Sequence, residues 1–470
     1  MKAFLAIVKQ TMRSAIRAKV FHVLFVLILL AVFGLPMTVS GDGTANGLVQ
    51  ISLTYSLGIV LTLISTTTLW LACSQLSREI EAYNIHLITA KPCPRWKIWL
   101  GKWLGIFLMN AVILLISTSC IFALIQTRVW YLHKSGRFTD AEIQRLDKEI
   151  RVGRRSFYPR LEHVQEEVDR YYKTHKAEID ALGKTEDEVR QEIRRRLWGQ
   201  KQEVAPGDMK TWTYRYVSGI GNELYLRYRI YSGSTAALDQ KDMIGVWGVK
   251  VPGAPVSVAD PFEYVQSTAM GGTFQELLIK STAIDKGDNN TVTIRYYNPS
   301  KEEWGLEKPP SAMFQQADGP VLMVKVASFL NNYCRAIALA LLQIAFLAAL
   351  GCMVSAAFST PVAAFVAVAY LVIGLSVHAA IDAPLQNDDG SYQYKNVAEK
   401  AAHYMARCVG HIVVSVDDLD ATSDLARGRL VENARLVNAV FSLFLIRTGL
   451  MVALGVWILQ KRELGTVIRK

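Results

Sequence analysis

The sequence predicts an α-helical integral membrane protein of six spans with an extracytoplasmic α+β domain, formed by a helical hairpin and a β-sandwich-like part. Three observations lead to this fold class. Six windows are nearly free of charge over the roughly 20 residues that a spanning helix needs. The stretch from Arg128 to Asp318 has the polarity of a water-soluble protein. Many of the basic residues, which give the chain a formal net charge of +11, flank the apolar windows.

The first 19 residues predict an amphipathic helix that lies on the membrane surface. Apolar side chains recur there at helical spacing, and the basic residues come without an acid. The alternative is a plain cytoplasmic extension of the first span, which is expected at 20–39. A cleaved signal peptide fits less well, because the apolar run is longer than in signal peptides and no small-x-small cleavage site follows it.

Five further windows complete the predicted spans. They are expected at 51–73, 103–126, 336–358, 361–380 and 436–459. Thr360 precedes Pro361 and marks the turn between the fourth and fifth spans, because a residue before proline resists the helical conformation. Arg447 falls inside the last window, where a charge is costly in lipid. Its side chain is therefore expected to face protein, water or a partner.

The positions of Lys and Arg predict the orientation of the spans. Segments 1–19, 74–102 and 461–470 are rich in these residues and fall on one side of the membrane if there are six spans. The positive-inside rule makes that side the cytoplasm, so both termini are expected there. The predicted parts are an interfacial helix at 1–19, spans one to three at 20–127, an extracytoplasmic insertion at 128–330, and spans four to six at 331–470 with an outer segment at 381–435.

The insertion divides into a helical and a β-rich part. Residues 139–203 are expected to be helical, and the sequences beginning at Thr139 and Thr185 each fit a capping box. From 210 to 326, apolar residues alternate with a period of two in runs separated by turn residues, which predicts a sandwich or jelly-roll-like fold. The aromatic side chains of these runs either fill the core or bind a glycan, a lipid or an envelope protein.

No catalytic or metal site is predicted. Potential ligands near the outer ends of the spans are His378, Asp382, His403, Cys408 and His411. They form neither an H-E-x-x-H motif nor a G-x-S-x-G elbow, and the cysteines lack C-x-x-C spacing. A disulfide between Cys334 and Cys408 stays open. Nucleic-acid binding is not expected, because the basic residues follow the ends of the spans.

The segment between the second and third spans is longer and more charged than a connection requires. Within "SREIEAYNIHLITAKPCPRWKIWLGK" (77–102), a helix is expected from Ser77 to Ala90, and the prolines that follow end it. The acids Glu79 and Glu81 lie beside aromatic and apolar residues. This composition favours a surface on which a cytoplasmic partner docks.

This segment resembles the corresponding part of type-2 ATP-binding-cassette (ABC) exporter permeases. That family has an acid before a short helix, a Pro-x-x-Arg turn and a Gly-Lys pair entering the third span. Pro92 to Arg95 and Gly101-Lys102 match this pattern, and Glu79 or Glu81 holds the acid position. The basic N-terminus, the "SAAFSTPVA" turn at 355–363 and the "KREL" exit at 461–464 agree with it. The large insertion departs from the minimal family pattern and leaves the substrate open.

The resemblance implies a permease subunit of an ABC transporter in the cell (inner) membrane, working as a homodimer or paired with a similar permease. It would export a lipid, a polymer or another envelope substrate, powered by a separate cytoplasmic ABC ATPase. The G-x-x-x-x-G-K-[ST] motif does not occur, so the chain is not expected to be an enzyme, and the partner rather than this chain would bind ATP and Mg. The residues implied in ATPase coupling are Glu79, Glu81, Tyr83, His86, Pro92, Arg95 and Lys102.

Polar residues within the spans are candidates for the translocation path. They are Asn110, Ser117, Gln343 and Arg447. The alternative for such residues is a hydrogen bond between neighbouring helices. An alternative for the whole chain is a membrane-anchored envelope binding or scaffold protein that acts through its outer domain, and a membrane enzyme is a third interpretation.

Overall fold

The computed structural model describes residues 2–34, 43–82, 94–159, 165–175, 186–221, 223–232, 242–253, 260–305, 309–315, 318–382, 397–410, 413–414 and 420–462. The chain forms two compact units. The helical unit contains Met1–Gly153, Ser328–Asp382 and Ala401–Lys470. The outer unit contains Arg154–Ala327 and Ala383–Lys400.

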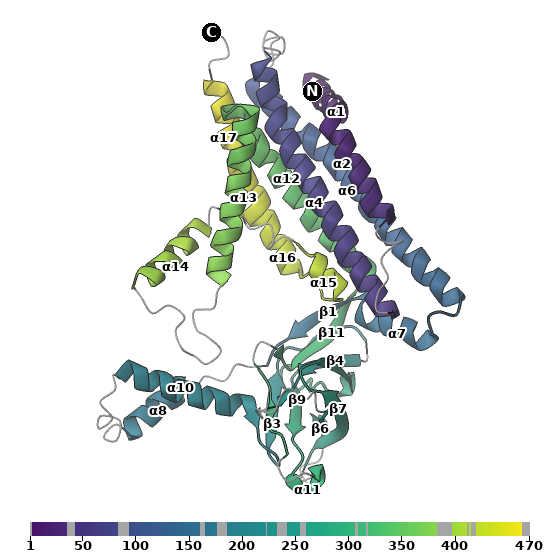
Figure 1. Cartoon of the computed structure of the whole chain (residues 1–470), viewed down its shortest axis with the longest axis vertical. Coiled ribbons are helices and arrows are strands. Elements are labelled where there is room, and N and C mark those ends of the chain that lie inside the picture. The colour runs from purple at the N-terminus through teal and green to yellow at the C-terminus, as the bar shows by residue number, and fades with distance from the viewer. Residues whose placement is uncertain are drawn as a thin grey trace. The chain divides into compact units, whose positions relative to one another are not determined.

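Within the described residues, the helical unit has five helices that are long and apolar enough to cross a membrane. They are α4 (Ala45–Glu81), α6 (Arg95–Lys134), α12 (Phe329–Ala357), α13 (Thr360–Asp382) and the continuous run of α16 (Asn433–Asn438), η5 (Ala439–Thr448) and α17 (Gly449–Lys461) (Figure 1). The count reaches six if the bent pair Lys2–Ile16 and Phe21–Gly34, which turns by 72°, is one span. The predicted membrane helical domain is confirmed, with five to six spans.

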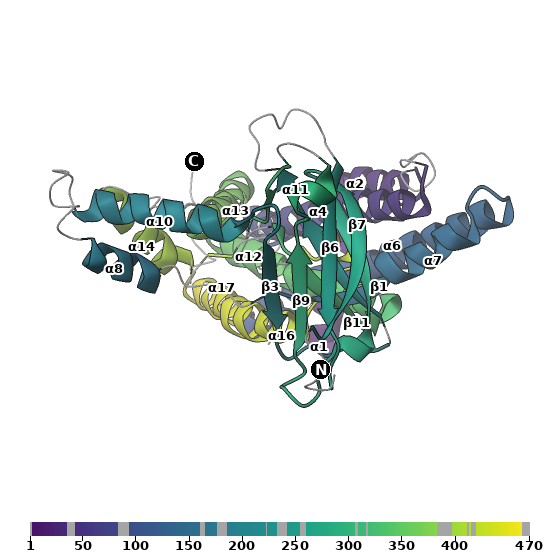
Figure 2. The ribbon, with the colours of Figure 1, turned by 90° about the horizontal axis from the view of Figure 1, so that it is seen from below.

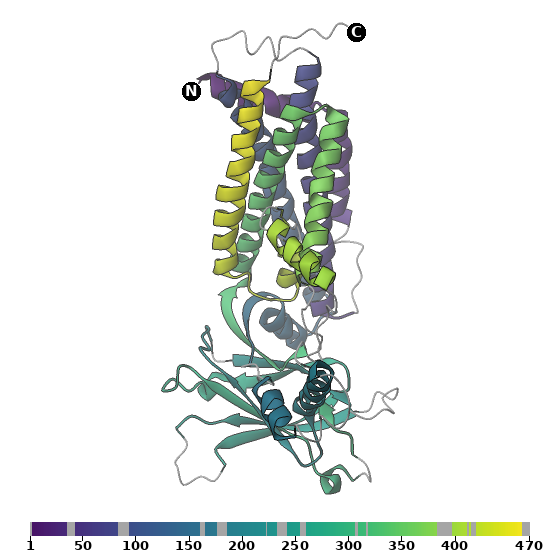
Figure 3. The ribbon, with the colours of Figure 1, turned by 90° about the vertical axis from the view of Figure 1, so that its left-hand side faces the viewer.

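Helix α12 is the centre of the helical unit and packs against α4, α6, α13 and α17 (Figure 3). Its apolar window is 72% buried, against 11% for the window of α13. Small residues allow the close packing of α12 on α4, since a Cβ on Gly351 would lie 2.5 Å from the Cβ of Ala72. The tightly packed α12 therefore contrasts with an α13 whose apolar surface is largely uncovered within the described chain.

The N-terminal helix α1 (Lys2–Ile16) packs on α6 through a G-x-x-x-G motif. A Cβ on Gly101 would lie 2.8 Å from Cγ2 of Ile7, and one on Gly105 would lie 2.8 Å from Cβ of Thr11. The two glycines thus let α1 approach the backbone of α6. One face of the predicted interfacial helix is consequently buried against protein, and α2 (Lys19–Leu29) and η1 (Leu30–Gly34) follow it.

Part of the predicted outer segment 381–435 is packed inside the helical unit. Val413 and Val414 lie against Gly374, which is eight residues before the end of α13, or about 12 Å along the helix axis. Val414 is buried in the core of the helical unit. The segment contains α14 (Val397–Gly410) and α15 (Thr422–Ala426). The whole segment was predicted to lie outside, because hydropathy windows detect only full spans. Val413 and Val414 instead pack within the helical unit.

The return of this segment is fixed at the start of α12. The Nδ2 atom of Asn332 donates to the carbonyl of Arg429 at 2.7 Å, and its Oδ1 accepts from the amide of Val431 at 2.8 Å. The guanidinium of Arg335 donates to the carbonyl of Val431 at 3.1 Å. Asn332 is fully buried and satisfies backbone groups that would otherwise be unpaired inside the bundle.

The helical unit also extends beyond the third predicted span. Helix α6 continues to Lys134, and α7 (Asp140–Glu149) packs on α4. The predicted capping box is present: the Thr139 hydroxyl accepts from the amide of Glu142, and the Glu142 carboxylate accepts from the amide of Thr139. The hydrogen bonds that the Glu142 carboxylate accepts from the amide and the hydroxyl of Thr139 lower the pKa of Glu142. Residues 128–153 of the predicted insertion therefore belong to the helical unit.

The outer unit contains two four-stranded sheets, with strand orders β1-β11-β4-β8 and β3-β9-β6-β7, and a three-stranded sheet β2-β10-β5. Figure 2 shows β3, β9, β6 and β7 side by side. The strands are β1 (Val152–Phe157), β2 (Glu203–Val204), β3 (Met209–Tyr214), β4 (Glu223–Arg229), β5 (Tyr231–Ser232), β6 (Asp242–Lys250), β7 (Phe262–Met270), β8 (Phe274–Lys280), β9 (Val292–Tyr297), β10 (Ala312–Met313) and β11 (Val321–Ser328). Short helices η2 (Ser281–Ala283) and α11 (Lys301–Trp304) follow β8 and β9.

The two larger sheets share one core, as a sandwich requires. Trp247 of β6 lies at its centre, with ring centroids 4.6 Å from Tyr228 of β4 and 4.9 Å from Tyr296 of β9. All three side chains are buried. The predicted β-rich part with antiparallel sheets is confirmed, and these aromatic residues fill the core, which was one of the two interpretations left open.

The helical part of the outer unit is shorter than predicted. Helices α8 (Gln165–Thr174) and α10 (Glu186–Gln202) form the expected hairpin around Val168, Tyr172 and Val189. The prediction of helix throughout 139–203 is wrong at 152–157, where β1 pairs with β11. Arg154 of β1 forms a 2.8 Å ion pair with Glu276 of β8, so a basic sequence is accommodated in a strand by its partner. The second predicted capping residue, Thr185, lies outside the described residues.

Candidate coupling network and transmembrane groove

Glu79 and Lys102, both predicted to act in ATPase coupling, form an ion pair between α4 and α6. The Lys102 Nζ lies 2.6 Å from Oε2 of Glu79, with the lysine side chain 3% exposed and the glutamate 16%. The Nε2 of Gln75 donates to the other carboxylate oxygen of Glu79 at 3.2 Å. Two charges so far from water are tolerated because they neutralise each other. Glu79 therefore contacts the third span rather than standing free on a separate docking helix.

Glu81 joins the end of α4 to the start of α13. Its Oε1 accepts from the backbone amide of Thr360 at 3.2 Å, an amide in the first turn that has no partner within its own helix. The Ser77 hydroxyl lies 2.9 Å from the carbonyl of Phe358 and 3.1 Å from that of Ser355. The last turn of α4 thus holds the connection between α12 and α13.

Arg95, at the start of α6, binds the end of the last span. Its Nη1 lies 3.1, 2.8 and 3.0 Å from the carbonyl oxygens of Leu459, Gln460 and Arg462. A guanidinium at the C-terminus of a helix satisfies unpaired carbonyls and opposes the negative end of the helix dipole. Arg462 in turn donates to the carbonyl of Ala356 at the end of α12 at 2.5 Å.

These contacts form one cluster, which we term the coupling-end network. Its members are Ser77, Glu79, Glu81, Arg95, Lys102 and Arg462. It connects the ends of α4, α6, α12, α13 and α17 on the side of the helical unit that carries segment 74–102 (Figure 1). Ser77 and Arg462 were not selected as site residues from the sequence, although they lie in segments 77–102 and 461–464, which carry the resemblance to ABC permeases. Tyr83, His86 and Pro92 lie outside the described residues.

A groove of about 400 Å³ opens on the helical unit between α4, α12 and α13. Gln343, predicted for the translocation path, lines it and approaches the Ser65 hydroxyl at 3.4 Å. Hydroxyls of Thr62 and Thr66 on α4 also line it, together with Asp420. These α4 residues were not predicted. The polar run from Ser65 to Thr68 inside an apolar window could have pointed to them. The surface of the groove is mainly apolar, and the Thr62 and Thr66 hydroxyls donate to the carbonyls of Gly58 and Thr62 within α4.

The other predicted path residues lie elsewhere. Asn110 is buried and its Nδ2 donates to the carbonyl of Ile106 at 3.0 Å within α6. Ser117 is buried in the same helix. The guanidinium of Arg447, halfway along the last span, donates to the carbonyl of Gly410 at 3.1 Å, at the C-terminal end of α14. Of the four predicted path residues, only Gln343 lines the groove. Arg447 faces protein, which is one of the environments expected for it.

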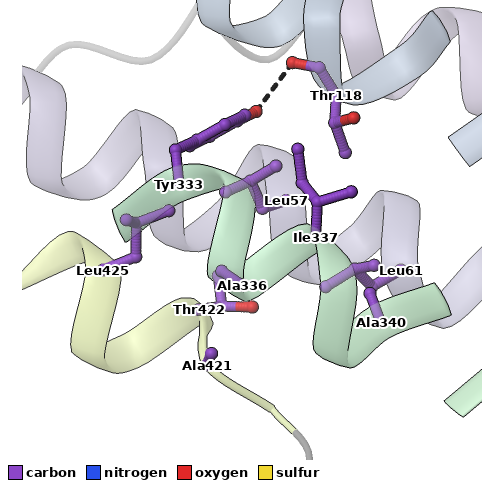
Figure 4. Close-up of a pocket in the computed structure, with 10 residues that line it drawn as sticks. All are labelled: Leu57, Leu61, Thr118, Tyr333, Ala336, Ile337, Ala340, Ala421, Thr422 and Leu425. Carbon is purple, nitrogen blue, oxygen red and sulfur yellow. Dashed lines mark hydrogen bonds between the residues drawn. The ribbon is translucent and has the colours of Figure 1, made fainter. Parts of the chain in front are cut away.

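A second, much smaller cavity of about 20 Å³ lies where α15 meets α4 and α12. Figure 4 shows its apolar lining, with the Tyr333 hydroxyl donating to the carbonyl of Thr118 at 2.7 Å. This volume has room for about one water molecule. The cavity is a packing defect around the returning segment, and the larger groove is the better candidate for a ligand path.

The possible metal and redox residues that the structure describes are His378, Asp382, His403, Cys334 and Cys408. No group of three or more His, Cys, Asp or Glu residues with metal-binding geometry occurs among the residues the structure describes. Cys334 and Cys408 are both free thiols, so the disulfide left open in the sequence analysis is not formed. His403 is buried, with its Nδ1 3.2 Å from the carbonyl of Ala380. His411 lies outside the described part of the chain.

Comparison with known proteins identifies the first membrane segment. Residues 5–131 match the family described as ABC-2 family transporter protein. No curated protein and no solved structure matches the chain. The matched residues include most of α1, all of α4 and most of α6, and with them Glu79, Arg95 and Lys102 of the coupling-end network. Residues 5–131 are therefore an ABC-2 family transporter segment, which confirms over this part of the chain the resemblance to type-2 ABC permeases seen in the sequence.

Proposed function

We propose that this chain is the transmembrane permease subunit of an ABC transporter that exports a lipid, a polymer or another envelope substrate. A separate cytoplasmic ATPase subunit supplies ATP hydrolysis, and two permease copies, or this chain and a similar permease, form the membrane part. The match at residues 5–131 carries the proposal, because segment 74–102 lies within it. Both termini and segment 74–102 face the cytoplasm of a cell (inner) membrane, and the outer unit faces the outside.

The coupling-end network supplies a mechanical link from the ATPase to the spans. Segment 74–102 joins α4 to α6, and Arg95 stands directly after its prolines. A displacement of this segment reaches α17 through Arg95, α13 through Glu81 and α12 through Ser77 and Arg462. Coupling between distant sites travels through such packed and hydrogen-bonded elements when they have two arrangements.

The groove between α4, α12 and α13 is the proposed part of the path that belongs to this chain. The Gln343 amide would meet hydrocarbon if the groove faced lipid, which is unfavourable, whereas the Thr62 and Thr66 hydroxyls donate to carbonyls within α4. The weakly buried α13 borders the same groove through Val368 and Leu371. A second permease subunit on this face would cover both, and would enclose the groove between the two copies.

Copurification tests the central claim. Affinity-purified full-length chain from its native membrane is expected to carry a protein with P-loop and signature motifs, and the complex in nanodiscs is expected to hydrolyse ATP. A P-loop Lys→Ala variant of that partner should abolish hydrolysis and leave copurification unchanged. Purification of the chain without any such ATPase would overturn the proposal and favour the anchored envelope-binding protein.

Cysteine labelling tests the orientation. In a background with the other reactive cysteines replaced by serine, Lys97→Cys at the start of α6 should react with a membrane-impermeant maleimide only after the membrane is opened. Arg137→Cys, beyond the other end of α6, should react in intact cells, since Arg137 is exposed and Lys97 is partly exposed. The reverse pattern would place segment 74–102 outside and would exclude a cytoplasmic ATPase as its partner.

A further inference from the structure

Strand β7 is a long open edge of the outer unit. It is the last strand of the sheet β3-β9-β6-β7, and no further strand pairs with it among the residues the structure describes (Figure 2). Its register with β6 runs without a bulge from Phe262 to Met270. Proteins usually protect such edges with lysines, prolines or bulges, because an open edge pairs readily with another strand.

The other edges of the two larger sheets carry such protection, and β7 does not. Strand β1 contains Arg154 and Arg155, β3 contains Lys210, and β8 contains Lys280. The nine residues of β7 include one charge, Glu263 near the start of the strand, and neither a lysine nor a proline. The sequence of β7 is therefore compatible with a neighbouring strand.

The hydrogen-bond pattern identifies the open backbone groups of β7. The amide of Val251 donates to the carbonyl of Pro261 at 2.9 Å, and the pairing of β6 with β7 continues in the same register. In an antiparallel ladder such bonds recur at every second residue, so the odd-numbered residues of β7 bond to β6. The amides and carbonyls that point to the free edge belong to residues 262, 264, 266, 268 and 270.

The same alternation places the even-numbered side chains of β7 on the outer face of the sheet. Val265 pairs with Trp247, which is buried in the core, so the odd-numbered side chains face the other sheet. Tyr264 on the outer face is held by its own sheet. A Cβ on Gly248 would lie 2.6 Å from Cε1 of its ring, and its hydroxyl donates to Asp260 at 2.6 Å. A side chain fixed in this way loses little conformational freedom when a partner binds.

We propose that β7 pairs with β7 of a second copy of this chain, antiparallel about a two-fold axis at Gln266. The open backbone groups of the two strands then bond to each other, as in any antiparallel ladder. Tyr264 lies opposite the partner's Thr268. Phe262 lies opposite the partner's Met270, which is 45% exposed in the single chain, and sulfur packs favourably against an aromatic ring.

The occupant is a second copy because β7 is complementary to itself in this register. Glu263 lies opposite position 269, about 20 Å along the strand from the partner's Glu263, so no like charges meet. One pair of strands is smaller than a stable interface between proteins. The inference therefore rests on the homodimeric form of the proposed function, in which the joined membrane parts raise the effective concentration of the two strands.

Disulfide cross-linking of the full-length chain in its membrane tests the register. Serine replaces the exposed Cys334 and Cys408. Gln266→Cys should then give an oxidant-dependent dimer, because the two Cα atoms at the axis lie about 5.5 Å apart, within disulfide range. Tyr264→Cys and Thr268→Cys should each fail to cross-link alone, and should cross-link to each other when the two variants are coexpressed.

Two further variants control for random collision and for the strand pairing itself. Thr211 is exposed on β3, at the opposite edge of the same sheet, and Thr211→Cys should not cross-link. Adding Thr268→Pro to Gln266→Cys should abolish the dimer. Proline removes an amide that points to the free edge and leaves the bonds to β6 in place, so the thermal midpoint of the chain should be unchanged.

Copurification of two differently tagged copies separates this inference from the proposed homodimer. Copurifying tags together with the expected cross-links support the pairing of β7. If the tags copurify but Gln266→Cys forms no dimer, or forms one no more readily than Thr211→Cys, the pairing is wrong and the homodimer stands. If the tags do not copurify, the homodimer is wrong and the pairing of β7 is wrong with it.

Discussion

Replacing Lys102 by methionine is expected to destabilise the helical unit by about 3 kcal/mol, the lower end of the cost of leaving one partner of a buried ion pair without the other. The lower end applies because the Glu79 side chain keeps 16% of its exposure and receives a second hydrogen bond from Gln75. At about 2 °C per kcal/mol for a large domain, the thermal midpoint of the purified protein should fall by about 6 °C.

The double variant Glu79→Gln/Lys102→Met distinguishes the contribution of the two charges to stability from the contribution of side-chain packing. It removes both charges and keeps the shape of both side chains, and removing a whole buried pair is close to neutral. Most of the lost stability should therefore return. The measurement is the fraction of monodisperse protein after heating, followed by fluorescence-detected size exclusion.

Lys97→Met is the matched control, because Lys97 lies in the same helix and is only partly buried, whereas Lys102 is buried. Its substitution should change the midpoint by no more than the error of the experiment, since surface changes are within about 0.5 kcal/mol. If Lys102→Met and Lys97→Met behave alike, or the double variant is less stable than Lys102→Met, the ion pair does not hold α4 to α6.

The sequence predicted the spanning helices because their signal is local. Twenty apolar residues identify a span without reference to any other part of the chain. The pairing of Glu79 with Lys102, in contrast, cannot be predicted from a local signal. Both residues were selected, yet the continuation of α4 to Glu81 and the approach of α6 decide that they meet, and these depend on tertiary packing.

The missed elements have physical reasons of the same kind. Strand β1 contains Arg154 and Arg155, and the ion pair of Arg154 with Glu276 and its contact with the Tyr225 ring accommodate Arg154 in a strand. Strand β7 lies at a sheet edge with mostly exposed side chains, so it lacks the apolar alternation that indicates a half-buried strand. The returning segment near Val414 is too short and too polar to register as a span.

Replacing Arg95 by alanine is expected to disconnect the last span from the ATPase without releasing the ATPase. The change removes a guanidinium that contacts three carbonyls at the end of α17, while Glu79, Glu81 and Lys102 keep their own contacts. The Gln460 carbonyl lies at an exposed position and can bond to water, and the contacts of Glu79, Glu81 and Lys102 still join the helices, so the fold should survive. The proposed transmission of movement from segment 74–102 to α17 should be lost.

Hydrogen exchange in the nucleotide-trapped complex measures this directly. In the wild-type complex, trapping with ATP and vanadate should change amide exchange in 449–461, the residues of α17. In Arg95→Ala this change should shrink by about tenfold, which corresponds to the loss of a coupling free energy of about 1.4 kcal/mol. Arg95→Lys keeps the charge but offers a single-point donor, and should fall between the two.

Lys97→Ala, two residues further along the same turn, provides the comparison for the loss of a partly exposed charge and should leave the response of α17 unchanged. Copurification of the ATPase decides between two roles of Arg95. If Arg95→Ala still binds the ATPase but shows no exchange change in α17, then Arg95 transmits movement and is not needed for docking. Loss of the ATPase from Arg95→Ala would make Arg95 a docking contact instead, and a full exchange response in that variant would show that force reaches the last span by another route, such as Glu81 and α13.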